Sequence, residues 1–401
     1  MKSTRFAYVH SMSFPNNEAN AFDAVWTASA LDNYVDTTFI VKQKKTSNKA
    51  LRDYYYISDS TLKFQSMYVN YFPDRILKKI NHYYEKFLAS YLRFHPHWFT
   101  RNIHKVLYAR DPKLLRYFGL LREKKNWLQD WILVYESHDP LGYDPNQFTD
   151  NDPYKDDPEL LRAAANFDIF ICNTQALADD LHFWTKGLLN PHVITLASPL
   201  ERLENAPKID FKEKICLGYI GTIDTFRGVD LLIKSLYYLP DNFTLRLVGR
   251  FRPERDVDST WLQNFLNDSH LKNRIDLNLT EHIEDVAGEI DRCDILVQTA
   301  SKDINDSRYA TPQKAFGYMV RGKPILVGNV PCHHEIFEDR KNGLMFKLNP
   351  KSLAEKALFL ANHPDFATKI AVGAWETSAA FNYNRRAQDI LALIEQKAQR
   401  I

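Results

Sequence analysis

The sequence predicts an α/β protein made of two doubly wound, Rossmann-like domains. With 401 residues the chain is long enough for about two domains, each with its own core. Short apolar, β-branched runs alternate with helical stretches along most of it, which is the pattern of parallel sheets with crossover helices. The composition, 45% hydrophobic and 25% charged, is that of a folded globular protein and excludes a disordered one.

Each half of the chain contains five expected strands. They are residues 6–9, 38–41, 132–135, 169–172 and 193–196 in the first half, and 217–220, 245–248, 275–277, 295–298 and 324–327 in the second. A polar, proline-punctuated segment near 200–208 separates them, so we expect domains at 1–200 and 208–383. Apolar residues at helical spacing predict a final helix within 384–401, which we expect to join the N-terminal domain.

The cysteines and the apolar segments indicate the compartment in which the protein is expected. Four scattered cysteines form no CxxC pair, which argues against a zinc knuckle or a disulfide framework and favours a reducing, cytoplasmic compartment. Cys332, His333 and His334 are adjacent and cannot all face one ion, so no metal site is expected. No leader and no apolar run of about 18 residues is evident, so we expect neither export nor a membrane span.

Positive charge is concentrated in one block. The net charge is only +2, but Arg75–Lys125 holds thirteen Lys/Arg against three acids, interleaved with aromatic residues. Such a block suits an anionic membrane surface or a lipid phosphate. The alternative is charge on outer helix faces with the rings in the core. No nucleic-acid-binding motif is present, so nucleic acid is not an expected partner.

Two predicted strands of the second half end in glycine with an arginine nearby. Gly221 and Thr222 end the first strand, and Arg227 follows in a polar loop; Gly249 and Arg250 end the next strand. Ligands of open α/β sheets bind beyond the carboxyl ends of the strands, and a cation there would meet an anion. The repetition on neighbouring strands predicts a site for an anionic ligand.

A helix is predicted to begin close to the same edge. Thr311 is a good N-cap, and Pro312 suits the first helical position. The free N–H groups and dipole of a helix start bind anions. Gln313 and Lys314 fall in the first turn, where a lysine opposes the dipole unless a negative ligand is bound. The alternative is a solvated lysine.

Taken in order, residues 215–350 resemble the donor domain of GT-B-fold glycosyltransferases, particularly retaining family 4. The shared features are the Gly-Tyr-Ile-Gly strand, the basic residue before Gly228, the Val-Gly strand end and Pro-x-Lys-x-Phe-x-Tyr-Met-x-x-Gly-Lys-Pro. The resemblance implies two domains facing across a cleft and a nucleotide-diphosphate sugar as donor. It also implies that Arg227 and the helix start at 311–314 contact the diphosphate, with Arg250 as a third cation.

One departure from that family stands out. Its members usually carry a Glu-x7-Glu pair that holds the donor sugar and the ribose, and the matching positions are Tyr309 and Gly317. Asp303 or Asp306 are candidates to replace the first glutamate. The sequence therefore indicates a nucleotide diphosphate without naming its sugar.

The N-terminal half has a looser likeness to the family. Asn17, Glu18 and Asn20 lie in the loop after the first strand, where the family holds the acceptor; the alternative is a simple capping loop. Tyr-Glu-Ser-His follows a later strand and resembles a strand-end segment of the family. Its histidine, His138, is the candidate for a donor-sugar or acceptor contact because of this strand-end position; the alternative is a satisfied structural histidine.

Together these features predict a glycosyltransferase of the hexosyltransferase type, acting on a glycan or lipid-linked glycan hydroxyl in cell-surface polysaccharide synthesis. We expect retention of configuration, no metal and no cofactor besides the donor, with His138, Arg227 and Lys314 at the catalytic centre. The expected location is the cytoplasm or the inner membrane face. Two alternatives are a GT-B-fold sugar-nucleotide 2-epimerase and a non-catalytic sugar-nucleotide-binding partner of another transferase.

Overall fold

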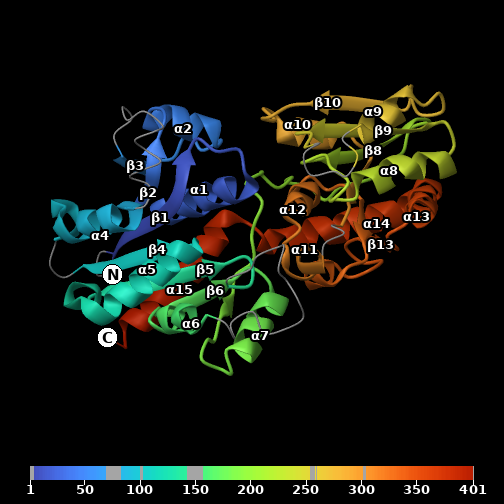
Figure 1. The fold of residues 1–401 in the computed structure, drawn as a ribbon. Helices are drawn as coiled ribbons and strands as arrows, with labels where there is room; N and C mark the ends of the chain where they lie inside the picture. Colours follow the sequence, from blue (N-terminus) through green and yellow to red (C-terminus); the bar gives the residue numbers. More distant parts are fainter. Residues whose placement is uncertain are drawn as a thin grey trace. The chain divides into compact units, whose positions relative to one another are not determined.

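The computed structural model describes residues 4–68, 83–99, 103–141, 157–252, 258, 260–300 and 304–400. The chain divides into two compact units (Figure 1). Unit 1 is Met1–Thr195 with Tyr383–Ile401, and unit 2 is Leu196–Asn382. The sequence analysis places the corresponding limits at 200, 208 and 383.

Unit 1 contains a seven-stranded sheet in the order β3-β2-β1-β4-β5-β6-β7, with every neighbouring pair parallel. Its strands are β1 (Thr4–Phe14), β2 (Asp36–Lys44), β3 (Lys63–Tyr68), β4 (His104–Ala109), β5 (Trp131–Ser137), β6 (Ile169–Cys172) and β7 (His192–Val193). Its described α-helices are α1 (Ala19–Asp32), α2 (Asn48–Tyr54), α4 (Tyr84–Phe94), α5 (Pro112–Lys124), α6 (Pro158–Ala165), α7 (Gln175–Trp184) and α15 (Tyr383–Ala398). The interior strand β5 is buried along its whole length, as expected when helices cover both faces of a parallel sheet.

Unit 2 contains a six-stranded parallel sheet in the order β10-β9-β8-β11-β12-β13. Its strands are β8 (Ile215–Ile220), β9 (Phe243–Gly249), β10 (Ile275–Leu279), β11 (Ile295–Gln298), β12 (Ile325–Gly328) and β13 (Leu344–Phe346). Its described α-helices are α8 (Val229–Ser235), α9 (Trp261–Asn267), α10 (Val286–Asp291), α11 (Ile304–Tyr309), α12 (Gln313–Val320), α13 (Pro350–Asn362) and α14 (Pro364–Thr377). Two doubly wound, Rossmann-like sheets confirm the predicted fold class. None of the helices described in either unit is long and apolar enough to cross a bilayer.

Three strands lie outside the ten that the sequence predicted: β3, β4 and β13. Strand β4 is central, yet its residues lie inside the basic block, where charge masked the strand pattern. The predicted strand 193–196 was wrong in extent, because β7 pairs with β6 only at His192 and Val193. Beyond that point the carbonyls of Ile194 and Thr195 accept hydrogen bonds from Arg386 of α15.

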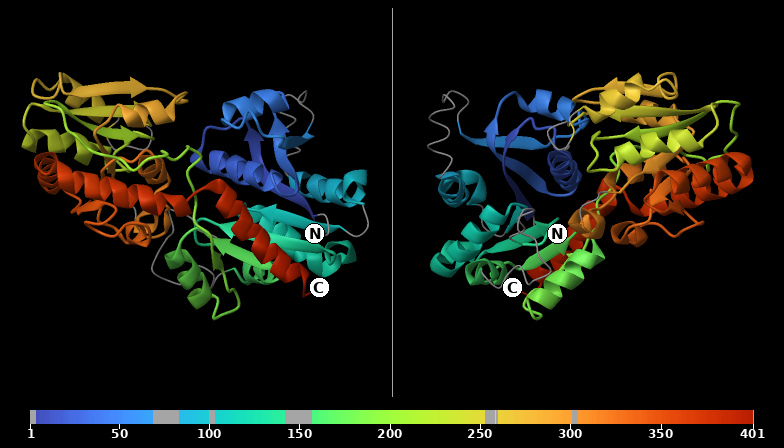
Figure 2. Two further views of the ribbon diagram at one scale, coloured as in Figure 1. Left: turned by 180° about the vertical axis from the view of Figure 1, so that it is seen from behind. Right: turned by 45° about the vertical axis from the view of Figure 1, so that its right-hand side comes forward.

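The last helix, α15, belongs to unit 1 (Figure 2). Buried charge anchors it there. Arg386 is 2% exposed, and its guanidinium donates to the Glu136 carboxylate at 2.5 Å and to the Ile194 carbonyl at 2.6 Å. The Tyr383 hydroxyl donates to Asp23 of α1 at 2.9 Å. Residues nearly two hundred or more positions apart in sequence are thus held together by one helix.

Removing the Arg386 side chain should destabilise unit 1 strongly. In Arg386→Ala the buried Glu136 carboxylate loses its main cation, and breaking a buried ion pair costs about 3–5 kcal/mol. Denaturant unfolding would measure this loss. The neighbouring Arg385 is 62% exposed and forms a 4.0 Å pair with Asp389, so Arg385→Ala is the matched control and should change stability by less than about 1 kcal/mol. Equal effects of the two substitutions would contradict the assigned role of Arg386.

Candidate functional site

The strand order of each sheet defines where a ligand would bind. In unit 1 the order reverses between β1 and β4, and in unit 2 between β8 and β11. Ligands of doubly wound folds bind beyond the carboxyl ends of the strands at such switch points. Most residues predicted from the sequence lie near the carboxyl ends of these strands or of the strands beside them.

In unit 2, two glycines allow the ends of β8 and β9 to approach each other. Gly221 and Gly249 have φ values of +149° and +141°. A Cβ atom on Gly249 would lie 2.1 Å from the Gly221 carbonyl oxygen, so only glycine fits there. A Cβ on Gly221 would lie 3.0 Å from Cε of Lys314. The fold therefore brings Lys314 to the end of β8, ninety-three residues earlier in the chain.

Helix α12 holds Lys314 in this position. The Tyr318 hydroxyl of the same helix accepts a hydrogen bond from the Ile220 N–H at 3.1 Å, which docks α12 on β8. Nζ of Lys314 lies 5.0 Å from the centre of the Tyr219 ring. That ring is fully buried, and its hydroxyl donates to the Thr222 carbonyl at 2.8 Å. A lysine on a rigid aromatic platform therefore lies at the carboxyl end of β8.

Arg227 supplies a second cation at the same place. The N–H of Arg227 donates to the Asp224 carboxylate at 2.7 Å, and Gly228, at φ +74°, precedes α8. Burial raises the pKa of Tyr219, and the positive charge of Arg227 opposes that rise, so the guanidinium lies near this ring. Within the described part of the chain, Arg227 forms no ion pair. Arg227 and Lys314 thus both lie near Tyr219.

Arg250, the third predicted cation, has a different environment. Its Nε lies 3.1 Å from a carboxylate oxygen of Glu281, so its charge is partly neutralised. Thr222 contributes its backbone carbonyl to Tyr219. Arg250 therefore differs from Arg227 in already having an acidic partner.

The expected helix start was wrong in detail. Helix α12 begins at Gln313, and Pro312 precedes it with no side-chain cap, so Thr311 is not the N-cap. The Gln313 N–H donates to the Thr311 carbonyl at 2.8 Å, and the Ala315 N–H donates to the Pro312 carbonyl at 2.9 Å. Because the proline bends the chain into a tight turn, two of the first amides are used locally. The anion-binding capacity of this turn rests more on Lys314 than the sequence suggested.

The two positions that match the glutamate pair are both buried. Tyr309 is 2% exposed, with the Arg308 guanidinium carbon 5.6 Å from its ring centre. A Cβ on Gly317 would meet side chains of Ile290 and Leu200 at 3.4 Å, so this position faces an apolar cluster. Of the two candidate replacements, Asp303 and the side chain of Asp306 lie outside the described residues.

A buried polar group behind Lys314 was not found from the sequence. Nδ1 of His333 donates to the Gly328 carbonyl at 2.6 Å, and Nε2 accepts from the Gln298 carboxamide at 3.3 Å. Burial lowers the pKa of His333 to about 4, and the charge of Lys314 acts in the same direction. His333 is therefore a neutral residue that supports β11 and β12, while Cys332 is buried in a small apolar cluster.

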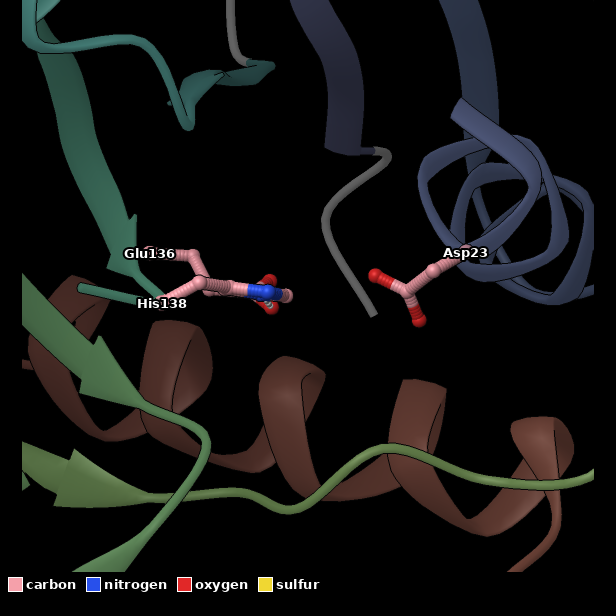
Figure 3. Close-up of side chains that lie close together, drawn as sticks. All are labelled: Asp23, Glu136 and His138. Atoms are coloured by element: carbon pink, nitrogen blue, oxygen red, sulfur yellow. Dashed lines mark hydrogen bonds and ion pairs between the residues drawn. The ribbon is translucent and has the colours of Figure 1, made fainter. Parts of the chain in front are cut away.

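In unit 1, His138 belongs to a network of buried charges at the ends of β4 and β5 (Figure 3). Its Nε2 lies 2.5 Å from Oε1 of Glu136, and one nitrogen of Arg110 lies 2.7 Å from Nε2 and 3.0 Å from Nδ1. With the proton on Nε2, this ring nitrogen donates to Glu136 and cannot also accept from Arg110, which leaves Nδ1 as the acceptor for the guanidinium. Arg110 also pairs with Asp23 of α1 at 2.5 Å. Both ring nitrogens of His138 are thus engaged by protein groups.

The network keeps Glu136 ionised although it is fully buried. Burial raises the pKa of Glu136, but the charges of Arg386 and Arg110 outweigh it and hold that pKa well below its usual range. The Tyr108 hydroxyl also donates to this carboxylate. His138, at 21% side-chain exposure, is more exposed than Glu136 or Arg110.

Asp23, Glu136 and His138 bring possible ligand atoms within 4.8 Å of one another (Figure 3). A metal ion does not fit this group. Each carboxylate already pairs with a guanidinium, Asp23 with Arg110 and Glu136 with Arg386. A dication placed there would lie beside two fixed positive charges.

The predicted acceptor loop is held by an aromatic hydroxyl. Tyr55 accepts from the Asn16 N–H at 2.8 Å and donates to the Asn16 carbonyl at 2.9 Å. The Glu18 N–H donates to the Asn16 side chain at 2.8 Å. Glu18 precedes α1 without capping it through its side chain, and Asn17 is half-buried. The simple capping role therefore does not apply to the Glu18 carboxylate.

Asn20 is exposed in the first turn of α1 and hydrogen-bonds to His10. His10 is 5% exposed, and its Nδ1 accepts from the Met12 N–H at 3.3 Å. Burial, followed by the charge of Arg110, lowers the pKa of His10 to about 4. The loop residue Asn20 is thus linked to the charged network through a neutral histidine.

The sequence analysis found His138 but missed Asp23, Arg110 and Arg386. Arg110 follows a strand, as Arg250 does, and the same rule would have selected it had β4 been recognised. Asp23 lies on the buried face of α1, where an isolated acid is itself a sign of a buried partner. No local feature of the sequence would have selected Arg386.

Comparisons with known proteins agree with this geometry. Residues 214–363 match the family model described as glycosyl transferases group 1. No curated protein sequence matched the chain significantly. HepE of Anabaena, solved in complex with UDP, is similar in structure, with a TM-score of 0.67 and 16% identity over 98% of this chain and 100% of that one. HepE was also solved with UDP-glucose.

Two further solved structures are similar over nearly their whole length. Sucrose-phosphate synthase of Thermosynechococcus elongatus has a TM-score of 0.69 and 14% identity, covering 99% of this chain and 100% of that one. A glycosyltransferase of Rickettsia africae has a TM-score of 0.68 and 14% identity, covering 99% of both chains. These likenesses confirm the GT-B fold.

Both units should lose stability in mild acid through their buried neutral histidines. Burial lowers the pKa of His10 and His333 to about 4 in the folded chain, from an ordinary value of 6.5. Between these two pKa values the unfolded chain binds protons that the folded chain excludes. The free energy of unfolding therefore decreases by about 1.4 kcal/mol per histidine for each unit by which the pH is lowered. Unfolding at pH 7.5 and 5.5 would show a smaller loss in His333→Gln than in the wild type. His334→Gln, at an exposed neighbour, should keep the wild-type loss.

Proposed function

We propose that this protein is a glycosyltransferase that moves a sugar from a nucleoside-diphosphate donor to a hydroxyl of a glycan or lipid-linked glycan. The observation that carries the proposal is the presence of two cations, Arg227 and Lys314, near Tyr219 at the carboxyl end of β8. This pair lies within residues 214–363, the segment that matches glycosyl transferases group 1.

The donor diphosphate would lie against the end of β8. Gly221 removes side-chain bulk from this strand end, so a phosphate could approach the backbone closely. Lys314 provides a compact charge and Arg227 a forked set of donors, which together suit the oxygens of a diphosphate. Thr222, Gln313 and Arg250 border the same strand and helix ends and remain candidates for further donor contacts.

In the proposed reaction the bond between the anomeric carbon and the diphosphate oxygen breaks, and negative charge builds up on the leaving diphosphate. Fixed cations aimed at that charge usually give the largest catalytic contribution. The acceptor oxygen forms the new bond to the anomeric carbon, and its proton passes to the leaving phosphate. This route retains configuration and needs neither a metal ion nor a carboxylate base.

Unit 1 would supply the acceptor contacts. His138 is the exposed member of the charged network, and Glu136 and Arg110 fix its ring. A substrate hydroxyl could donate to Nδ1 only in place of Arg110, so we infer that Arg110 moves when the acceptor binds. Asn17, Glu18 and Asn20 offer carboxamide and carboxylate groups that hydrogen-bond well to sugar hydroxyls.

UDP is the first nucleotide to test, because HepE was solved with UDP and with UDP-glucose. A hexose donor would make the protein a hexosyltransferase, and cell-surface polysaccharide synthesis is the setting we propose. Titration calorimetry with UDP measures donor binding separately from transfer. Donor binding tests the proposed site, and sugar transfer tests the proposed activity, so each can fail without the other.

Substituting either cation should weaken donor binding and transfer with the fold intact. Lys314→Ala and Arg227→Ala each remove a charged hydrogen bond worth about 1.5–3 kcal/mol, so binding should fall about 10- to 150-fold. The rate of transfer should fall at least as far, because the charge grows in the transition state. Calorimetry and a donor-consumption assay would measure the two effects.

The chain offers matched controls on exposed positions of unit 2. Lys272 lies before β10, and Arg292, 65% exposed, lies before β11, both away from the carboxyl ends of the strands. Lys272→Ala and Arg292→Ala should behave as the wild type. Wild-type binding in Lys314→Ala and Arg227→Ala together would exclude the diphosphate site.

The same assays separate the two alternative functions. Epimer formed from donor alone, with no acceptor present, would identify a 2-epimerase. Donor binding without turnover across an acceptor panel would identify a non-catalytic binding partner, which the buried Tyr309 and Gly317 at the glutamate positions motivate.

A further inference from the structure

The helix α4 has a face on which aromatic rings and positive charges alternate. We call this the α4 face and define it as Tyr83, Lys86, Phe87, Arg93 and Phe94, all of them exposed. The spacing of these residues places them along one side of a helix. We propose that the α4 face docks onto an anionic lipid surface.

The opposite side of the helix fixes α4 to unit 1. Tyr84, Leu88, Ala89 and Leu92 are buried there. The Tyr84 hydroxyl donates to the His10 carbonyl of β1 at 2.9 Å. Helix α4 lies at the margin of unit 1 (Figure 1), so its outer face is presented on a rigid base.

The exposed rings are large and lie close to the cations. Tyr83, Phe87 and Phe94 are 43%, 49% and 61% exposed. Nζ of Lys86 lies 5.1 Å from the Tyr83 ring centre, and the Arg93 guanidinium carbon lies 4.7 Å from that of Phe94. Such pairs suit the headgroup region of a bilayer, where the rings enter the interface and the cations remain at the phosphates.

No acid lies on this face. The acid of the helix, Glu85, is half-buried, and its charge acts on Lys42 and Tyr117. Lys86 and Arg93 therefore give the α4 face a charge of +2. A surface that is both apolar and cationic is complementary to anionic lipid.

Elsewhere in the predicted basic block, three arginines serve the fold. Arg110, Arg116 and Arg122 pair with acids of other elements. Lys124 and Lys125 are exposed, but the ring of the nearby Trp127 is half-buried and so less available to a surface than an exposed ring. Of the described part of the block, α4 is the helix on which exposed rings and unpaired surface charge coincide. Arg75, Lys78, Lys79 and Arg101 lie outside the described residues.

A lipid surface accounts for the α4 face better than a nucleic acid. Bases would stack on ring faces, yet the cations Lys86 and Arg93 cover the rings of Tyr83 and Phe94. Docking does not depend on sugar transfer, because it is measured without donor or acceptor. If the protein does not bind lipid, the proposed diphosphate site is not contradicted.

The full chain can be tested by vesicle flotation. Wild-type protein should float with vesicles of mixed phosphatidylcholine and phosphatidylglycerol, bind much less to phosphatidylcholine alone, and dissociate as salt rises. Lys86→Glu with Arg93→Glu should weaken binding about 30-fold or more, since each cation near an anionic surface contributes about fivefold. Phe87→Ser with Phe94→Ser should also weaken binding while leaving the charge unchanged.

The matched control is Lys124→Glu with Lys125→Glu, which makes the same change of charge in the same basic block. This variant should bind vesicles within about fivefold of the wild type. Circular dichroism would verify that all variants fold. The proposal is overturned if the wild type does not float, if the control loses as much binding as the α4 variant, or if the protein binds RNA in a gel shift but no vesicles.

Discussion

The ion pair between Glu136 and Arg386 is the interaction on which unit 1 depends. Both groups are almost completely buried, 2.5 Å apart, so each is stable only while the other is present. The guanidinium also binds the carbonyls of Ile194 and Thr195, which end the sheet. One side chain of the last helix thereby fixes the end of β5, the exit from β7 and the placement of α15.

The same carboxylate connects this architecture to the candidate acceptor site. Glu136 orients the ring of His138, and Arg110 closes the network against Asp23 of α1. Before an acceptor binds, these buried, paired charges hold the His138 ring in one orientation. Structural support and the proposed substrate contact would therefore be provided by one set of residues, and a change in either would affect the other.

Unit 2 uses a different device at its candidate donor site. Close approach of two strand ends, allowed by Gly221 and Gly249, brings the end of β8 beside Lys314. The lysine is held by packing on Tyr219 and through the docking of α12 on β8. In unit 2, backbone geometry and an aromatic platform hold Lys314 in place. In unit 1, paired charges hold His138.

The sequence by itself determined the two Rossmann-like sheets and proposed Arg227, Lys314 and His138, because strand patterns and strand-end residues are local signals. It missed β4, whose charged flanks hid the pattern, and it misplaced the start of α12, where Pro312 allows a tight turn. Only the tertiary structure paired Glu136 with Arg386, separated the paired arginines of the basic block from the α4 face, and buried Tyr309. These outcomes depend on contacts between residues far apart in the chain, and no local pattern encodes such contacts.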